Sequence, residues 1–348
     1  HNGIIENFRE LREELMKHGY QFASQTDTEV VPILVTHLLK EGLSPQDAVA
    51  MAFSRLQGAF ALAFIFADYP DLLIGARQGP PLAVGYGKGE NFLGSDAIAL
   101  SHLTSRIAYL EDGDWVEISP ARIIIHNADG EIIERPITQS GFSGASVGKG
   151  NYRHFMQKEI YEQPGVVGET IKMYCNPTTL DVTLPALPFD LAKIERIQLV
   201  ACGTSFYAAQ AAKYWLESIA KIPTGVDVAS EYRYRAPILD KKGLTIVISQ
   251  SGETADTLAA LRYCKSQGQH TLAIVNVPES TIARESEVVF RTYAGPEIGV
   301  ASTKAFTCQL TALACLAILA GKLRGTITPE PTSSASRTRL LRGIGGTR

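Results

Sequence analysis

The chain has 348 residues, of which 45% are hydrophobic and 20% are charged, and its formal net charge is −3. This composition is typical of a globular protein with more than one domain. A charge so near zero gives no reason to expect nucleic acid or an acidic membrane surface as a partner. The strongly apolar runs at 59–67 and 311–321 are shorter than the ~20 residues that span a bilayer, so no membrane association is expected.

The first part of the chain, residues 1–140, combines predicted helices with short predicted strands. Helical patterns cover 8–19, 28–42 and 44–56. From residue 59 the hydrophobic period shortens towards two, which predicts strands at 60–67, 72–76, 82–86, 91–93, 115–118 and 123–126. Helices followed by many short strands indicate an α+β layered domain.

The rest of the chain begins with a connector at 141–187, rich in Gly, Ser and Pro, with one helix predicted from Tyr152 to Glu162. Residues 188–327 alternate strands and helices, which predicts an α/β domain with a doubly wound parallel sheet. Strands are expected at 197–202, 225–229, 244–249, 272–277 and 289–293. Residues 328–348 are rich in Ser and Arg and are expected to be a disordered or aberrant tail.

The stretch Ser249-Gln-Ser-Gly-Glu-Thr-Ala-Asp-Thr257 joins a predicted strand to a helix N-terminus, where unpaired N–H groups and the helix dipole favour an anion. Ser249, Ser251 and Thr254 add hydroxyl donors, and Gly252 allows close approach of a ligand. The loop has no lysine and no P-loop pattern, so a compact sugar phosphate suits it better than a nucleoside triphosphate. Ordinary turn and N-cap chemistry is the alternative interpretation.

Two further segments have the same arrangement. Cys202-Gly-Thr-Ser205 follows one predicted strand, and 297–304 precedes a long apolar helix. In an open α/β sheet such loops meet at the carboxyl edge, where ligands bind. Lys304, at the start of its helix, is expected to be solvated rather than a phosphate ligand. The five cysteines and seven histidines show no metal-ligand spacing, so we expect reduced thiols, no metal and no cofactor in a cytoplasmic protein.

Three long motifs resemble the first sugar-isomerase (SIS) half of the glutamine:fructose-6-phosphate amidotransferase family: ACGTS at 201–205, SQSGETADT at 249–257 and EIGVASTKAFT at 297–307. RHFMQKEIYEQP at 153–164 is similar to the family's interdomain segment. HNGIIEN at 1–7 and TDTE at 26–29 are similar to its glutaminase domain. The resemblance implies a partial αββα fold of N-terminal-nucleophile hydrolases for the first domain and a first SIS domain at 188–327.

The resemblance also implies roles for individual residues. Asn2 and the Gly3 N–H match the family's oxyanion hole, and Gly3 and Asp27 match its glutamine-binding residues. Taken alone, Asn2-Gly3 would be a tight turn and Asp27 a helix cap. The family's sugar-phosphate site is matched by Ser205, Ser249, Gln250, Ser251, Thr254, Val300 and Ser302.

The activity implied is the synthesis of glucosamine 6-phosphate and glutamate from fructose 6-phosphate and glutamine, in a homodimer. A non-catalytic, sugar-phosphate-binding regulator with the same SIS fold is the alternative, and the glutaminase-like residues favour the enzyme. The chain starts at His1 and its first cysteine is Cys175, so the nucleophilic cysteine and the second SIS half are expected to lie outside it. We therefore expect the chain as given to bind a sugar phosphate without turnover.

Overall fold

The computed structural model describes residues 1–140, 148–179, 181–183, 185–235 and 237–327. The chain forms two compact units, His1–Asn151 and Tyr152–Arg348, and each unit is described by itself. The tail expected at 328–348 lies outside the described residues. The domain limits predicted from the sequence remain proposals.

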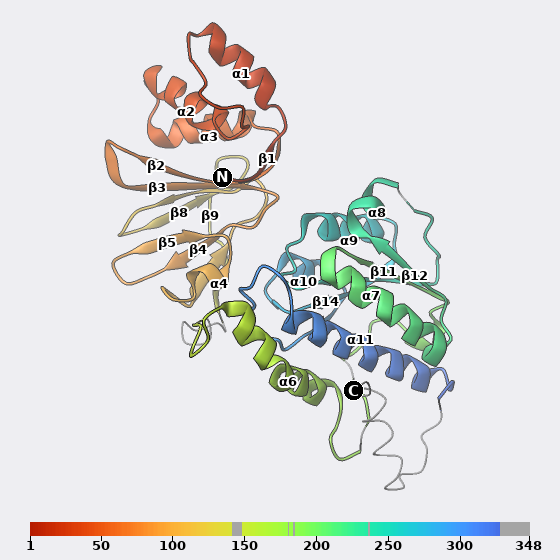
Figure 1. The fold of residues 1–348 in the computed structure, drawn as a ribbon. Helices are drawn as coiled ribbons and strands as arrows, with labels where there is room; N and C mark the ends of the chain where they lie inside the picture. The colour runs from red at the N-terminus through yellow and green to blue at the C-terminus, as the bar shows by residue number, and fades with distance from the viewer. Residues whose placement is uncertain (141–147, 180, 184, 236, 328–348) are drawn as a thin grey trace. The chain divides into compact units, whose positions relative to one another are not determined.

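The described part of the first unit combines helices with two antiparallel sheets (Figure 1). The helices are α1 (Phe8–Lys17), α2 (Val30–Lys40), α3 (Pro45–Arg55) and the short α4 (Ala97–Leu100). The larger sheet has the order β1-β2-β3-β7-β8-β9, and the smaller has the order β10-β6-β4-β5. Their bounds are β1 (Asn2–Ile5), β2 (Gly58–Phe66), β3 (Tyr69–Gln78), β4 (Ala83–Tyr86), β5 (Asn91–Gly94), β6 (Arg106–Tyr109), β7 (Trp115–Ile118), β8 (Ile123–His126), β9 (Ile132–Ile133) and β10 (Ile137–Gln139).

Alternating side chains along the strands build the layers of this unit. Phe60 and Leu62 of β2 belong to the core shared with α1, α2 and α3, whereas Ala61 between them belongs to the core between the two sheets. Leu100 of α4 packs on the other face of the smaller sheet. The layers are therefore helix, sheet, sheet and helix, with α4 alone in the last layer among the described residues. This arrangement confirms the prediction of a partial αββα fold.

The described part of the second unit is built on a parallel sheet with the order β12-β11-β13-β14-β15. The strands are β11 (Arg196–Ala201), β12 (Thr224–Val228), β13 (Gly243–Ser249), β14 (His270–Val275) and β15 (Val288–Arg291). The core on one face includes residues of α7 (Gly203–Trp215) and α11 (Lys304–Leu323), and that on the other includes residues of α8 (Ala229–Arg235), α9 (Ala255–Ser266) and α10 (Thr281–Glu285). The short helices η1 (Leu191–Lys193) and η2 (Leu216–Ala220) complete the unit. The sheet is therefore doubly wound, as predicted.

The helix α6 (Phe155–Tyr174) extends well beyond Glu162, where the sequence predicted its end. Pro164 lies inside it, although a proline lacks the N–H group that an interior position needs. Val166 and Val167 pack against a buried cluster that includes residues of α11. This apolar contact favours continuation of the helix, and the predicted end at Glu162 was wrong.

Among the described helices, α11 is long and apolar enough to cross a membrane by length and composition, which the short apolar runs of the sequence did not indicate. Half of its most apolar window is buried. Leu313, Leu316 and Ala317 have no exposed surface and lie in the core of the second unit. A core helix therefore accounts for this composition.

Candidate functional site

Two polar loops meet at the carboxyl edge of the sheet in the second unit. One follows β11 at residue 202, and the other occupies 249–254 between β13 and α9. The parallel register pairs Ala201 with Ile248, so the ends of these neighbouring strands coincide. β12, the next strand along the chain after β11, pairs with one edge of β11, and β13 pairs with the other edge. The strand order therefore reverses direction at β11. Ligands of open α/β sheets bind at such a switch point.

The hydroxyl groups of the 249–254 loop are bonded within the loop. The Ser249 Oγ accepts a hydrogen bond from the Gly252 N–H at 3.0 Å and lies 3.0 Å from the Thr254 Oγ1. The Ser251 Oγ accepts a bond from the Glu253 N–H at 3.2 Å. Part of the turn chemistry expected as the alternative is thus present. Ser249 is 3% exposed, whereas Ser251 and Thr254 are half-buried. The first N–H groups of α9 lack intrahelical partners.

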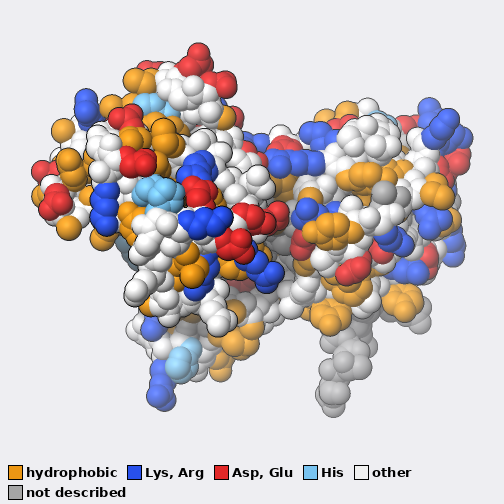
Figure 2. All heavy atoms as spheres, turned by 90° about the horizontal axis from the view of Figure 1, so that it is seen from above, with side chains coloured by type: hydrophobic (Ala, Val, Ile, Leu, Met, Phe, Trp, Pro, Cys, Tyr) orange, Lys and Arg blue, Asp and Glu red, His pale blue; other side chains and the backbone are white. Residues whose placement is uncertain are grey.

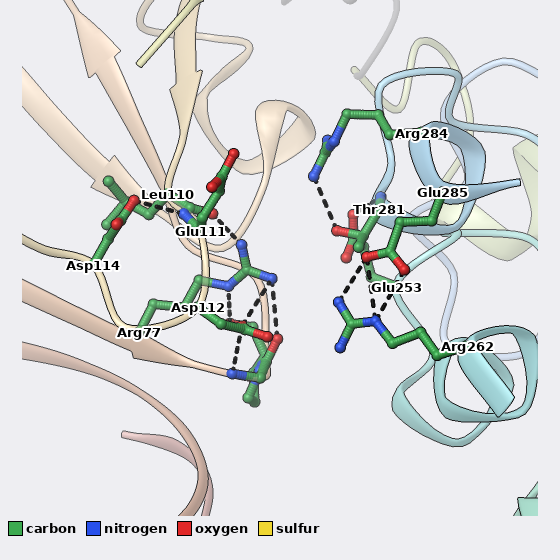
Figure 3. A network of polar contacts seen from close by, with 12 residues as sticks. Arg77, Leu110, Glu111, Asp112, Asp114, Glu253, Arg262, Thr281, Arg284 and Glu285 are labelled. Carbon is green, nitrogen blue, oxygen red and sulfur yellow. Dashed lines mark hydrogen bonds and ion pairs between the residues drawn. The ribbon is translucent and has the colours of Figure 1, made fainter. Parts of the chain in front are cut away.

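Two residues of the 249–254 loop, Gly252 and Glu253, are hydrogen-bonded to α10; Figure 3 shows Glu253 beside Thr281. The Ile282 N–H donates to the Gly252 carbonyl at 3.0 Å, and the Thr281 N–H donates to the Glu253 Oε1 at 2.7 Å. Gly252 has a φ of +68°, and a Cβ at this position would lie 1.9 Å from the Ser280 Oγ. Both the backbone conformation and the close packing therefore require glycine here.

Ser205, near the start of α7, is held by a residue that the sequence analysis missed. The Gln309 Nε2 of α11 donates to the Ser205 Oγ at 2.9 Å. Ser205 is 7% exposed and Gln309 is 1% exposed. The Gln309 Oε1 has no hydrogen-bond partner in the described structure. The amide therefore fixes the serine at the cost of one unsatisfied acceptor.

Asn276, just after β14, connects the backbone of Gln250 to the segment that follows β15. Its N–H donates to the Gln250 carbonyl at 3.2 Å, and its Nδ2 donates to the Gly295 carbonyl at 2.7 Å. Its Oδ1 accepts bonds from the Thr292 hydroxyl at 3.2 Å and the Ala294 N–H at 3.0 Å. No local sequence pattern marks this buried residue, because its partners lie in loops 16 to 26 positions away along the chain.

The predicted sugar-lining residues lie in the loop 297–303, ahead of α11. Glu297 folds this loop, because its Oε2 accepts a bond from the Ser302 hydroxyl at 2.9 Å and its Oε1 accepts one from the Thr303 N–H at 2.8 Å. Val300 is fully exposed at the tip. The loop therefore has an exposed apolar side chain at its tip and a serine hydroxyl fixed by Glu297.

Lys304 is not solvated, and the prediction for it was wrong. It is 3% exposed, and its Nζ lies 2.7 Å from the Glu162 Oε2 of α6. A buried ammonium group needs a close counter-charge. Glu162 supplies that charge from a helix 142 residues upstream, which the local sequence around Lys304 does not show.

In the first unit, Asp27 lies beside β1. Its Oδ2 accepts a hydrogen bond from the Ile5 N–H at 2.8 Å, while the His1 Nδ1 and Thr28 Oγ1 lie 2.6 Å apart. The N-cap of α2 is Glu29, without a side-chain cap bond in the described structure, so the helix-cap interpretation of Asp27 is not realised. The first strand and the 27–28 segment are therefore joined at two points.

The loop that carries Asp27 is fastened by Glu29, another residue the sequence analysis did not select. The Glu29 carboxylate accepts bonds from the Ala23 N–H at 2.7 Å and from the N–H and hydroxyl of Ser24 at 2.7 and 2.6 Å. These bonds, chiefly that from the Ser24 hydroxyl, lower the pKa of Glu29. The ionised side chain therefore holds Ala23 and Ser24, which precede Asp27 in the chain, in a fixed position.

Asn2 and Gly3 lie in a strand rather than in the tight turn that was the alternative. They pair with Ala61 and Phe60 of β2, and both are exposed. Gly3 has a φ of +101°, and a Cβ there would lie 2.1 Å from the Ala59 carbonyl oxygen. The backbone at this point therefore excludes every other residue type.

The charged side chains are intermixed on the face shown in Figure 2, where basic and acidic groups alternate over short distances. Within the described ranges, no group of three or more His, Cys, Asp or Glu side chains is arranged to hold a metal ion.

Comparison with known proteins identifies both units. Residues 1–102 match the glutamine amidotransferase domain family, and residues 190–319 match the SIS domain family. The chain is 59% identical over 345 residues to a glutamine–fructose-6-phosphate aminotransferase (isomerizing) of Bradyrhizobium diazoefficiens, which covers 99% of this chain and 56% of the relative. The enzyme of the same name from Zymomonas mobilis is 55% identical over 330 residues, covering 95% of this chain and 54% of the relative. The chain belongs to the family of these aminotransferases.

The chain spans about half the length of the curated relatives of this aminotransferase family that it matches. A solved structure described as the C-terminal domain of glucosamine-fructose-6-phosphate aminotransferase from Francisella tularensis is 45% identical, with a TM-score of 0.51. It covers 57% of this chain and 55% of that chain. These matches confirm the family predicted from the motifs of both units.

Proposed function

We propose that the carboxyl edge of the second unit binds a sugar phosphate. The observation that carries the proposal is the meeting of two Ser/Thr loops at the switch point between β11 and β13. In this proposal the phosphate group contacts Ser205, Ser249, Gln250, Ser251 and Thr254, and the sugar lies beside Val300 and Ser302.

The chemistry of the two loops favours a monoanionic or dianionic phosphate on a small ligand. Hydroxyl and backbone N–H groups surround a phosphate with donors, and the dipole of the 12-residue helix α9 adds positive potential. Gly252 keeps the loop tight.

For the first unit we propose glutamine binding by Asp27 and Gly3, with Asn2 and the Gly3 N–H stabilising charge on the amide oxygen. The support is the hydrogen bond from the Ile5 N–H to Asp27, which holds this carboxyl beside the strand that carries Asn2 and Gly3. A preorganised oxyanion donor is worth about 3 kcal/mol in acyl transfer.

The whole protein is then an aminotransferase that forms glucosamine 6-phosphate and glutamate from fructose 6-phosphate and glutamine. The names of the relatives and the match of 1–102 to the amidotransferase domain support this over a regulatory sugar-phosphate-binding protein. The expected homodimer, cytoplasmic location and lack of a cofactor, nucleic-acid partner or membrane partner remain predictions.

The test of the proposed binding is a calorimetric titration of the chain with fructose 6-phosphate, fructose and inorganic phosphate. Fructose 6-phosphate should bind most tightly and inorganic phosphate more weakly, while fructose should not bind measurably, because the loops recognise the phosphate group. Equal affinity for fructose and fructose 6-phosphate, or no binding of fructose 6-phosphate, would contradict the proposal.

A further inference from the structure

A buried carboxyl group of α6 contacts the backbone of the predicted sugar-lining loop. Glu159 is 2% exposed, and its Oε1 accepts hydrogen bonds from the Ile298 N–H at 2.6 Å and the Gly299 N–H at 3.0 Å. Its Oε2 is buried without a hydrogen-bond partner in the described structure. Burying a carboxyl group with one unsatisfied oxygen is unfavourable for stability. The position of Glu159 therefore points to a role other than packing.

Gly299 is packed directly against this carboxyl group. A Cβ at position 299 would lie 2.5 Å from the Glu159 Oε2 and 3.5 Å from the Met156 Cα. The loop can therefore approach α6 this closely only with glycine at this point. The glutamate and the glycine form one contact, although 140 positions separate them in the sequence.

The loop held in this way is bracketed by the two parts of the proposed phosphate site. Before it, Gly295 is tied through Asn276 to the backbone of Gln250. After it, Gln309 of α11 is bonded to Ser205. Any shift of the backbone between 295 and 309 moves Val300 and Ser302 relative to the phosphate loops. The middle of the predicted sugar-lining loop is fixed to α6 by Glu159. The end of the loop is fixed to α6 by the ion pair of Lys304 with Glu162.

We propose that Glu159 is a positioning residue for sugar recognition: its carboxyl group sets the place of Val300 and Ser302 without touching the ligand. This rests on the proposed sugar-phosphate site. The loop 249–254, which carries the proposed phosphate donors, is bonded to α10 through the Gly252 carbonyl and the Glu253 carboxylate, and Glu159 makes no hydrogen bond to it in the described structure. Glu159 therefore governs the affinity for the sugar portion and leaves the affinity for inorganic phosphate unchanged.

The test compares Glu159→Ala and Glu159→Gln with Glu169→Ala, a control on the same helix whose exposed side chain pairs with Lys172. Calorimetry should show that Glu159→Ala weakens fructose 6-phosphate binding about tenfold, because the loop loses the two bonds that hold it and the ligand must then order it, and changes inorganic phosphate affinity less than about twofold. Glu159→Gln should recover most of the loss, because its carbonyl oxygen accepts the same two N–H groups. An equal loss for both ligands, or none for either, overturns the proposal.

Hydrogen exchange and a second variant keep the inference separate from the proposed function. If the parent chain does not bind fructose 6-phosphate, the proposed site fails, but the Ile298 and Gly299 amides should still exchange about tenfold faster in Glu159→Ala, with β13 unchanged. Gly299→Ala should also speed the exchange of these amides in the parent, because its Cβ clashes with the Glu159 carboxyl group. In the Glu159→Ala background this carboxyl group is absent, so Gly299→Ala should change the exchange much less. Unchanged exchange in Glu159→Ala, or additive effects of the two changes, overturns the positioning role.

Discussion

Gln309 and Ser205, 104 positions apart in the sequence, are joined by a buried hydrogen bond of 2.9 Å from the Gln309 Nε2 to the Ser205 Oγ. The bond fixes the serine hydroxyl from α11, the helix that follows the predicted sugar-lining loop. One end of the proposed phosphate site is therefore oriented by a side chain that does not belong to either phosphate loop.

Replacing this amide by a side chain of similar size should weaken ligand binding. Gln309→Leu is expected to reduce fructose 6-phosphate affinity about fivefold, the usual effect of about 1 kcal/mol from one hydrogen bond. Stability should change little, because the unsatisfied Gln309 Oε1 is removed as well. Calorimetry and urea unfolding measure the two effects. Gln267→Leu, at the exposed end of α9, is the control; equal affinities of the two variants would refute the role of Gln309.

The glycine in the 249–254 loop should be irreplaceable for a steric reason. Gly252→Ala places a Cβ against Ser280, whereas Gly268→Ala has the same kind of backbone, with a φ of +72°, and no atom within 4 Å of the new Cβ. The control should lose about 1 kcal/mol of unfolding free energy from the left-handed backbone. Gly252→Ala should lose at least about 1 kcal/mol more. Equal losses in chemical denaturation would show that the close packing against Ser280 is unimportant.

Asp27 is predicted to have two separable effects. Asp27→Asn retains an acceptor for the Ile5 N–H but removes the negative charge that would bind the α-amine of glutamine. Hydrogen exchange of the Ile5 amide should thus stay near the parent value in Asp27→Asn and rise in Asp27→Ala. Glutamine binding, measured by calorimetry, should fall in both variants. Retention of glutamine affinity by Asp27→Asn would contradict the proposed charge interaction.

Buried thiols should make the second unit sensitive to alkali. Burial raises the pKa of Cys315 to about 11, from an ordinary value of 9.0, and raises the pKa of Cys264 and Cys308 as well. The unfolded chain thus releases these protons before the folded one does. The contribution of the neutral thiols to the free energy of unfolding is complete below pH 9. For Cys315 this contribution is lost as the pH rises through about 11. Urea midpoints should fall less steeply from pH 9 to 10.5 in Cys315→Ala than in the parent; parallel curves would contradict this.

Much of the fold could be predicted because its elements have strong local patterns. The strands of the parallel sheet are buried on both faces and appear as continuous apolar runs, such as Leu244–Ile248. Strands β1, β6, β9 and β10 were not predicted, because their sequences show no clear alternation of apolar and polar residues. The end of α6 was misplaced because the helix continues through Pro164, and the packing of Val166 and Val167 beyond it is with residues distant in the sequence.

The loops of the proposed site could be located from the sequence, but the residues that support these loops could not. Ser249 and Thr254 stand in a recognisable strand–loop–helix motif, and their hydroxyls lie together as that motif suggests. Glu159, Asn276 and Gln309 act through contacts with residues distant in the sequence, which no local pattern encodes. The burial of Lys304 was missed for the same reason.

The most direct test of the proposed sugar-phosphate site is fructose 6-phosphate affinity in the double variant Ser249→Ala/Thr254→Ala. Ser266→Ala/Thr326→Ala, in the same unit but outside the proposed site, is the matched control. Loss of two hydroxyls beside a phosphate should weaken binding at least about 30-fold, with native hydrogen exchange retained in β11 and β14. The control pair should bind like the parent. A double variant that folds and binds fructose 6-phosphate with the parent's affinity would show that the ligand does not occupy this edge of the sheet.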